Sequence, residues 1–342
     1  MLGKNIGIDL GTSSVLIYVR GKGIVLREPA VVAMDKTTGQ ILKIGYEAQA
    51  MLGRTPKNII AVHPIREGVI SDYESTEVMI RYYLRKANGT SLFKPDVVIC
   101  VPSRINEVEE RAVRQAAINA GAGSIELIEE PMAAALGAGL DTSRPRGSMV
   151  VDIGGGTTDI AVISLNDVVL SESVKCAGDK FDEALVKYVR KAYGILIGER
   201  TAEEIKIKIG CVYRRPEVLT MTVHGRSLSS GMPKEFTISS ENVMSALSDT
   251  ADIIADAVHD VLSKTPPELI SDISSDGIVM TGGGSLLYGF DKLLASRIGI
   301  HVYVAEDAIS CVAKGTGMAI DHIDNLSDIK VNSPKKKLWN QL

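Results

Sequence analysis

Short runs of alternating apolar and polar residues occur twice along the chain in the same order, each broken by a glycine-rich turn. The first copy runs from Asn5 to Val19 and the second from Val150 to Ile163. Alternation with a period of two predicts β-strands, and in each copy a hairpin turn leads to a third apolar run. We therefore predict two three-stranded antiparallel units, with Asp9 and Asp152 at the ends of their first strands.

Each half then continues as a strand followed by a helix. In the first half the strand Asp96–Val101 precedes a helix that begins after Asn106, which with Glu109 has the spacing of a capping box. In the second half a strand over 277–281 leads through glycines to a helix expected over 286–299. This order implies an α/β protein with two similar domains, whose glycine turns face one cleft.

Two stretches of mixed composition interrupt this scheme and divide the chain into four subdomains. The second of them is expected to hold two amphipathic helices and two strands. The predicted boundaries are 1–31 with 66–140 for subdomain IA, 32–65 for IB, 141–177 with 246–325 for IIA, 178–245 for IIB, and 326–342 for a polar tail.

Composition and charge narrow the class of protein. The chain has 342 residues, which is long enough for two domains. Its net charge of −4 argues against binding to nucleic acid. The four cysteines lack a C-x-x-C pair, so we expect neither disulfides nor a zinc site, in agreement with a reducing cytosol. No apolar run approaches the roughly 20 residues of a membrane span.

The two glycine turns carry the candidate chemistry. Exposed backbone N–H groups in such turns favour anions, and two turns that face each other can hold a polyphosphate between them. A carboxylate beside a phosphate site needs a cation, most simply Mg²⁺. We therefore expect Asp9 and Asp152 to face the metal through water. The phosphate-binding residues are predicted to be Gly11, Thr12, Ser13, Gly154, Gly155, Gly156 and Thr157.

Two further motifs have alternative interpretations on the residues alone. The turn Thr281–Gly284 is either an ordinary loop or a backbone surface for a base or a phosphate. The pair Glu129 and Glu130 before Pro131 either caps a helix or supplies a carboxylate that positions an attacking water molecule. The pattern leaves both questions open.

The adjacent large apolar residues Leu92 and Phe93 lie in a predicted loop, where both cannot easily turn inward. They either pack partly against the protein or insert into a membrane interface, where Lys94 would suit anionic headgroups. The basic run 335–337 is most simply a solvated tail.

The paired motifs resemble those of the actin, Hsp70 and sugar-kinase superfamily of ATPases, and over nearly the whole chain the sequence is similar to bacterial actins of the MreB/Mbl type. The stretches that carry this resemblance are IGIDLGTSSVLIYVRGKGIVLREPAVVA at 6–33, HPIREGVISDY at 63–73, IEEPMAAALGAGL at 128–140, DIGGGTTDIAVI at 152–163, GDKFDEAL at 178–185, IKIKIG at 205–210 and TGGGSLLYG at 281–289.

The resemblance implies an actin-like fold of duplicated ribonuclease H-like domains, with ATP and Mg²⁺ in the central cleft and a slow ATPase activity. It implies homopolymeric double filaments on the inner, anionic face of the cytoplasmic membrane. These filaments would direct cell-wall synthesis and maintain rod shape, with transmembrane and wall-synthesis proteins of the rod complex as partners.

The resemblance also assigns roles to residues. Glu130 and Thr157 match positions linked to hydrolysis, and Leu92 and Phe93 match the membrane loop. Where family members often have Ala-Asn and Gly-Gly, this chain has Ser13-Ser14 and Ala177-Gly178. In both places small residues replace small residues. We do not expect the amphipathic N-terminal helix that some members use. The residues that match the nucleoside pocket are Gly178, Asp179, Glu203, Lys206, Gly283, Gly284 and Leu287.

Two other functions of the same superfamily remain as alternatives. A small-molecule kinase would need a substrate-binding base in the cleft, and the sequence gives no such signal beyond the hydrolysis residues. A chaperone-type ATPase would need a peptide-binding domain after about residue 325, where this sequence has only the short tail.

Overall fold

The computed structural model describes residues 4–89, 91, 93–103 and 105–321. Two five-stranded sheets with the same strand order form its framework. The first sheet has the order β10 (Ser124–Glu129), β9 (Asp96–Val101), β1 (Asn5–Leu10), β2 (Ser14–Val19) and β3 (Gly23–Pro29). The second has the order β18 (Val302–Val304), β17 (Ile278–Thr281), β11 (Ser148–Ile153), β12 (Thr158–Ser164) and β13 (Asp167–Val174).

Strand directions confirm the predicted duplication. In each sheet the first three strands in sequence order are antiparallel neighbours, and the later two run parallel to the first. Because β1 and β11 occupy the same place in the two sheets, Asp9 and Asp152 lie at equivalent positions one residue before the end of their strands. The two halves therefore place matching carboxylates and matching turns toward each other.

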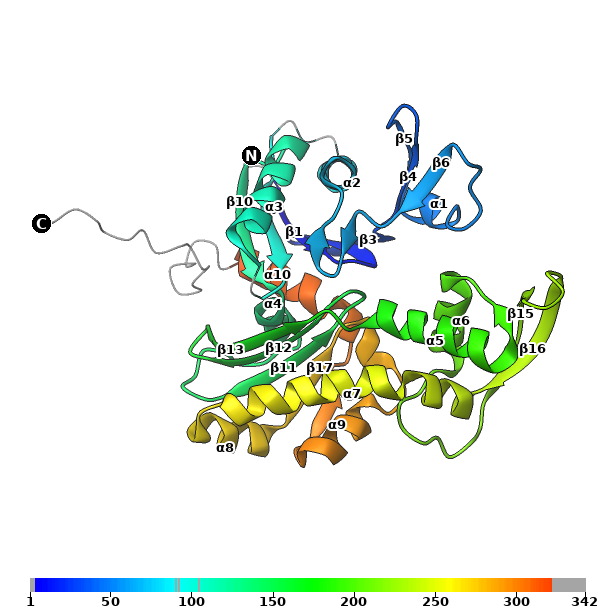
Figure 1. Cartoon of the computed structure of the whole chain (residues 1–342). Coiled ribbons are helices and arrows are strands. Elements are labelled where there is room, and N and C mark those ends of the chain that lie inside the picture. The colour runs from blue at the N-terminus through cyan, green and yellow to red at the C-terminus, as the bar shows by residue number, and fades with distance from the viewer. Residues whose placement is uncertain (1–3, 90, 92, 104, 322–342) are drawn as a thin grey trace, which may run out of the picture.

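Helices cover the outer faces of both sheets (Figure 1). The outer helices of the first sheet are α2 (Tyr73–Asn88) and α3 (Glu107–Ala120), and those of the second are α7 (Ser240–Lys264), α8 (Pro267–Asp276) and α9 (Phe290–Ile298). The capping box of Asn106 and Glu109 is present at the start of α3, as predicted. Alternate strand residues pack on these helices, which gives each domain its own core.

Helices α4 (Glu130–Gly137) and α10 (Cys311–Asp321) lie between the two sheets and share a third core with strand residues of both. Their backbones touch where they cross. A Cβ atom built on Gly137 would lie 1.8 Å from the carbonyl oxygen of Cys311, and one on Gly315 would lie 1.8 Å from that of Ala133. Only glycine permits so close an approach, so these two residues fix the contact between the domains.

The two inserted stretches form smaller sheets beside the cleft, at the right of Figure 1. The first contains β4 (Val32–Asp35), β5 (Ile41–Ile44), α1 (Tyr46–Gln49) and β6 (Ile59–Val62), followed by the short hairpin β7 (Ile65–Arg66) and β8 (Val69–Ile70). The second contains α5 (Gly178–Tyr193), β14 (Ile195–Leu196), α6 (Glu199–Ile209), β15 (Thr220–Ser227) and β16 (Pro233–Ser239), which includes the two predicted helices and two predicted strands.

The helix predicted over 286–299 is wrong in its first part. A 3₁₀ turn, η1 (Gly283–Leu286), is followed by a break, and α9 begins only at Phe290. The break occurs because Gly289 has a φ of 78° and packs on Tyr213, while the Tyr288 carbonyl accepts a hydrogen bond from the Val212 N–H. The apolar spacing alone could not reveal these contacts. A second 3₁₀ turn, η2 (Ala308–Ser310), precedes α10.

Among the helices of the described residues, none combines the length and the apolar character needed to cross a membrane. The predicted tail, 326–342, lies outside the described residues.

Candidate functional site

A cavity of about 490 Å³ lies between the two domains, a size typical of small-molecule sites. The glycine turns of both halves face it, as the sequence predicted. Every residue predicted to contact nucleotide, metal or attacking water lines this one cavity: Asp9, Gly11, Thr12, Ser13, Glu130, Asp152, Gly154, Gly155, Gly156, Thr157, Gly178, Asp179, Glu203, Lys206, Gly283, Gly284 and Leu287.

The two turns are built alike. In the first, the Gly11 N–H donates to the Ser14 carbonyl at 3.1 Å, and in the second the Gly154 N–H donates to the Thr157 carbonyl at 2.9 Å. Each hydrogen bond closes a four-residue turn directly after a buried strand. The remaining N–H groups of the turns are then free to face an anion in the cavity.

The two turns also touch each other. A Cβ atom on Gly155 would lie 1.9 Å from the Ser13 hydroxyl oxygen, and one on Gly156 would lie 2.5 Å from that of Thr12. The hairpin between β7 and β8 contacts both turns. The Gly68 N–H donates to the Thr12 hydroxyl at 3.2 Å, and a Cβ atom on Gly68 would lie 2.9 Å from Thr157 Cγ2. Glycine at 155 and 156 is therefore required for the two domains to close over the cavity.

Asp9 and Asp152 lie at the base of the turns. Burial raises the pKa of Asp9 to about 7, with a further contribution from the negative charge of Asp152. Burial likewise raises the pKa of Asp152 to about 6, although the Thr281 hydroxyl donates to its Oδ1 at 2.7 Å and lowers it. Two buried carboxylates with raised pKa values favour a cation beside them.

This donor set fits a hydrated Mg²⁺ better than a metal held by protein alone. Within the described part of the chain, no three His, Cys, Asp or Glu side chains come together as a metal cluster. Mg²⁺ keeps several waters and binds one or two carboxylates together with substrate phosphates. Asp9 and Asp152 therefore fit the role of partners to a metal that phosphate oxygens and water would complete.

Glu130 lies near the carboxylate of Asp159, to which the sequence patterns assigned no role. Burial raises the pKa of Glu130 well above its ordinary value, and the charge of Asp159 raises it further. Asp159 is fully buried, and burial raises its pKa to about 7. Its Oδ1 accepts a hydrogen bond from the Ser103 N–H at 3.2 Å. A sequence signal existed, because Asp159 ends the glycine motif two residues after Thr157.

The helix-capping interpretation of the Glu129 and Glu130 pair is not supported. Helix α4 begins at Glu130, and its N-cap residue Glu129 makes no side-chain capping hydrogen bond. The Glu129 carboxylate instead accepts a hydrogen bond from the Ser103 hydroxyl at 3.1 Å. Glu130 therefore lines the cavity without capping its own helix.

The start of α5 brings a second wall to the cavity. The N–H groups of Gly178 and Asp179 donate to the carbonyls of Gly154 and Gly155 at 3.1 and 2.8 Å. Lys206, on α6, donates to the Gly178 carbonyl at 3.0 Å and to Asp182 Oδ2 at 2.7 Å. Asp182 was not predicted, although it lies within the GDKFDEAL stretch.

The third glycine turn packs against the end of β11. Gly282 has a φ of +79°, and a Cβ atom there would lie 2.3 Å from the Ile153 carbonyl oxygen. A Cβ atom on Gly283 would meet no heavy atom within 4 Å, although Gly283 lines the cavity. The cavity is also lined by Gly68, Arg215 and Tyr288, which the sequence analysis did not single out.

Of the two residues predicted to contact the membrane, Phe93 follows α2 in the chain and is not among the residues that line this cavity. Leu92 is outside the described residues, whereas the side chain of Phe93 is 56% exposed. The Phe93 carbonyl accepts a hydrogen bond from the Asn88 side-chain amide at 3.1 Å. The loop therefore presents at least one large apolar side chain to solvent.

Comparison with known proteins identifies similar sequences over almost the full chain. The family model described as MreB/Mbl protein matches residues 3–328. The cell shape-determining protein Mbl of Bacillus cereus is 49% identical over 327 residues, which cover 95% of this chain and 98% of that protein. The cell shape-determining protein MreB of Escherichia coli is 50% identical over 330 residues, or 95% of each chain.

Solved structures agree with the fold. MreB 5 of Spiroplasma citri bound to AMPPNP has a TM-score of 0.91 at 37% identity, covering 96% of this chain and 99% of that one. The same protein bound to ADP has a TM-score of 0.90. The MamK double helical filament has a TM-score of 0.78 at 21% identity, with 93% and 98% coverage, and supports the fold alone.

Proposed function

Because the chain belongs to the MreB/Mbl family, we propose that it is an actin-like cytoskeletal protein that binds ATP, assembles into filaments and determines cell shape. The observation that carries this proposal is the cavity itself, in which two equivalent phosphate-type turns from two similar domains come into contact. A nucleotide held by both turns would favour the closed arrangement of the domains.

We assign the triphosphate to the turns at 11–13 and 154–157, and the nucleoside to the wall formed by α5, α6 and the third glycine turn. Support comes from the ADP and AMPPNP that MreB 5 of Spiroplasma citri binds with the same fold. Mg²⁺, when bound, would offset the charge of the phosphates. Asp9 and Asp152 would hold it through water, as their burial and raised pKa values favour.

Glu130 and Thr157 are proposed to position the water molecule that attacks the terminal phosphate. Both line the cavity, and Thr157 is the last residue of the second phosphate turn. Enzymes catalyse phosphoryl transfer chiefly by positioning the reacting groups. We expect hydrolysis by this chain to be slow and coupled to polymerisation.

Head-to-tail stacking of copies would give an open filament, since a heterologous contact that does not close continues to grow. We propose double filaments on the inner face of the cytoplasmic membrane, attached through Leu92 and Phe93 to anionic lipid. There they would guide transmembrane and wall-synthesis proteins of the rod complex. The exposure of Phe93 supports the membrane part of this proposal.

Electron microscopy and sedimentation of the full-length protein with Mg²⁺ and ATP, on vesicles containing anionic lipid, test the proposal. We expect ATP-dependent filaments on the vesicles. A protein that forms no filaments but phosphorylates a sugar or an acid would instead be the small-molecule kinase.

A matched pair of variants tests whether filament formation depends on the cavity. Gly283→Leu should fill open space within the cavity and abolish both ATP binding and filaments. Gly198→Leu is the control, because a Cβ atom there also meets nothing within 4 Å, yet Gly198 lies outside the cavity. Equal behaviour of the two variants would contradict the assignment.

A further inference from the structure

The cavity is strongly acidic, and its two cations are not equivalent. Lys206 is already paired with Asp182 at 2.7 Å. Arg215 takes part in none of the ion pairs found among the described residues, although it lines the cavity. The carboxylates that line the cavity are Asp9, Glu130, Asp152, Asp179, Asp182 and Glu203. Arg215 is therefore the cavity cation that carboxylates leave available for a ligand.

Two contacts hold the Arg215 guanidinium in place. Its central carbon lies 4.0 Å from the centroid of the Tyr288 ring, and one terminal nitrogen donates to the Gly210 carbonyl at 3.0 Å. The Tyr288 backbone is fixed in turn, because its carbonyl accepts a hydrogen bond from the Val212 N–H at 3.0 Å. A guanidinium stacked on an aromatic ring presents its opposite face to a further flat partner.

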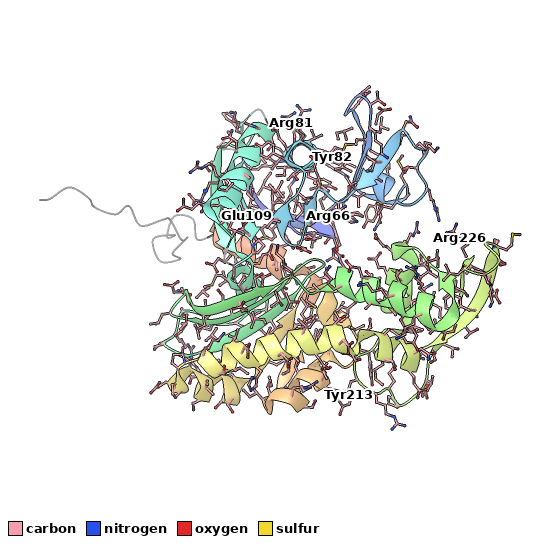
Figure 2. The ribbon with its side chains drawn as sticks, in the orientation of Figure 1. Arg66, Arg81, Tyr82, Glu109, Tyr213 and Arg226 are labelled. Carbon is pink, nitrogen blue, oxygen red and sulfur yellow. The ribbon has the colours of Figure 1, made fainter. Side chains whose placement is uncertain are left out.

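The loop that carries Arg215 follows α6 and includes Tyr213, which Figure 2 labels at the lower side of the second domain. Arg215 Nε is buried without a hydrogen-bond partner among the described residues. A buried donor left unpaired requires an explanation other than protein hydrogen bonding. The stack on Tyr288 fixes the plane of the guanidinium but leaves the Nε N–H without an acceptor among the described residues.

Arg215 lies at the wall of the cavity that the phosphate turns do not occupy. Those turns contact each other and the start of α5. Arg215 instead contacts Gly210, Cys211 and Tyr288. A Cβ atom on Gly210 would lie 2.7 Å from the Leu287 side chain. A nucleotide with its phosphates at the turns would therefore direct its base toward this wall.

We propose that Arg215, supported by Tyr288, recognises the purine base of the nucleotide by stacking its guanidinium on the ring. The inference rests on the proposed nucleotide-binding function and extends it to base selection. Purines offer a larger π-surface than pyrimidines, so the stack favours ATP, ADP and other purine nucleotides over CTP or UTP. No sequence pattern predicts this pair, because no motif joins residues 215 and 288.

Isothermal titration calorimetry with the full-length protein tests the proposal, with Mg²⁺ and four ligands: ATP, ADP, CTP and inorganic tripolyphosphate. We expect Arg215→Met and Arg215→Lys each to weaken ATP and ADP by about the same factor, roughly tenfold. CTP and tripolyphosphate should change less than threefold, so that the ratio of ATP to CTP affinity falls. Arg214→Met is the control, because Arg214 is exposed in the same loop and does not line this cavity.

Tyr288→Leu should reproduce the loss of ATP affinity, and the double variant with Arg215→Met should lose little more. Rescue of ATP binding by Arg215→Lys, with a larger loss for tripolyphosphate in Arg215→Met, would show a phosphate contact and overturn base stacking. Unchanged ATP affinity in Arg215→Met would also overturn it. If the unmodified protein failed to bind ATP at all, the proposed function itself would fail. Melting temperatures report whether each variant is folded.

Discussion

Asp152 and Asp159 lie directly opposite each other on the antiparallel strands β11 and β12, and both side chains are buried. Like charges at opposed positions of a sheet repel each other. The charge of Asp152 accordingly raises the pKa of Asp159, in addition to the larger effect of burial. The sheet beside the cavity is thus destabilised by these two carboxylates when both are charged.

This arrangement predicts that the nucleotide- and metal-free protein loses stability as pH rises. An aspartate in the unfolded chain titrates near pH 4, whereas the folded values are about 7 for Asp9 and Asp159 and about 6 for Asp152. Between these limits the folded state binds more protons, so the free energy of unfolding falls with rising pH. We expect the Tm at pH 8 to be about 3 to 6 °C below that at pH 6.

Thermal melts of Asp159→Asn and of the exposed-site control Asp256→Asn check this assignment. The Asp159 variant should be more stable than the unmodified protein at pH 8 and should show a flatter pH dependence, because one buried charge is removed. The Asp256 variant should keep the original slope. A steep slope in both variants would place the titrating groups elsewhere.

The contact between the phosphate turns predicts that position 155 does not tolerate a side chain. In Gly155→Ala the new methyl group would overlap the Ser13 hydroxyl, from which a Cβ atom lies 1.9 Å. The two turns must then separate, and we expect ATP affinity to fall by more than tenfold in a titration with Mg²⁺ and ATP.

Gly154→Ala is the matched change, since a Cβ atom there lies 3.2 Å from the Thr157 carbonyl oxygen and reaches nothing of the other domain. Its loss of affinity should be several-fold smaller. Equal losses of ATP affinity in the two variants would show that contact between the turns is not the reason for glycine at position 155.

The placement of Glu130 predicts a separation of binding from hydrolysis. Glu130→Ala should keep ATP binding but slow phosphate release by roughly a hundredfold or more, as expected for a residue that orients the attacking water. Phosphate release and nucleotide affinity should be measured on the same preparation. Glu129→Gln is the neighbouring control. Release at the unmodified rate in Glu130→Ala would remove this residue from the mechanism.

The loop after α2 predicts membrane binding that is independent of assembly. Replacement of Leu92 and Phe93 by Ser should abolish co-sedimentation with anionic vesicles and leave ATP-dependent polymerisation intact, because Phe93 does not line the cavity. Leu165→Ser controls for the loss of an exposed apolar residue, since Leu165 is 60% exposed at the β12–β13 turn. Persistent sedimentation of the double variant would place the membrane contact elsewhere.

Much of the framework follows from local sequence patterns. The alternating runs around Asp9 and Asp152, the capping box at Asn106 and the position of Pro131 are all short-range signals. Because the motif occurs twice, one copy supports the other, and a common cavity follows from the symmetry of the two halves.

What the patterns missed depends on contacts between distant segments. The break before α9 exists because residues 287–289 pack against 210–213, about 75 residues earlier in the chain. The stack of Arg215 on Tyr288 belongs to the same contact. Asp159 was visible in its motif, but its place near Glu130 depends on how the two domains meet. No local spacing encodes these relations.

The crossing of α4 and α10 has a mechanical consequence. Since the backbones meet at Gly137 and Gly315, the helices can neither approach further nor slide without steric overlap. The domains are then free mainly to rotate about that point, and displacement grows with distance from it. The tips of β5 and β16 lie far from the crossing in Figure 1. A change of a few tenths of an ångström between Ser13 and Gly155 would therefore be amplified at the tips of these two inserted sheets.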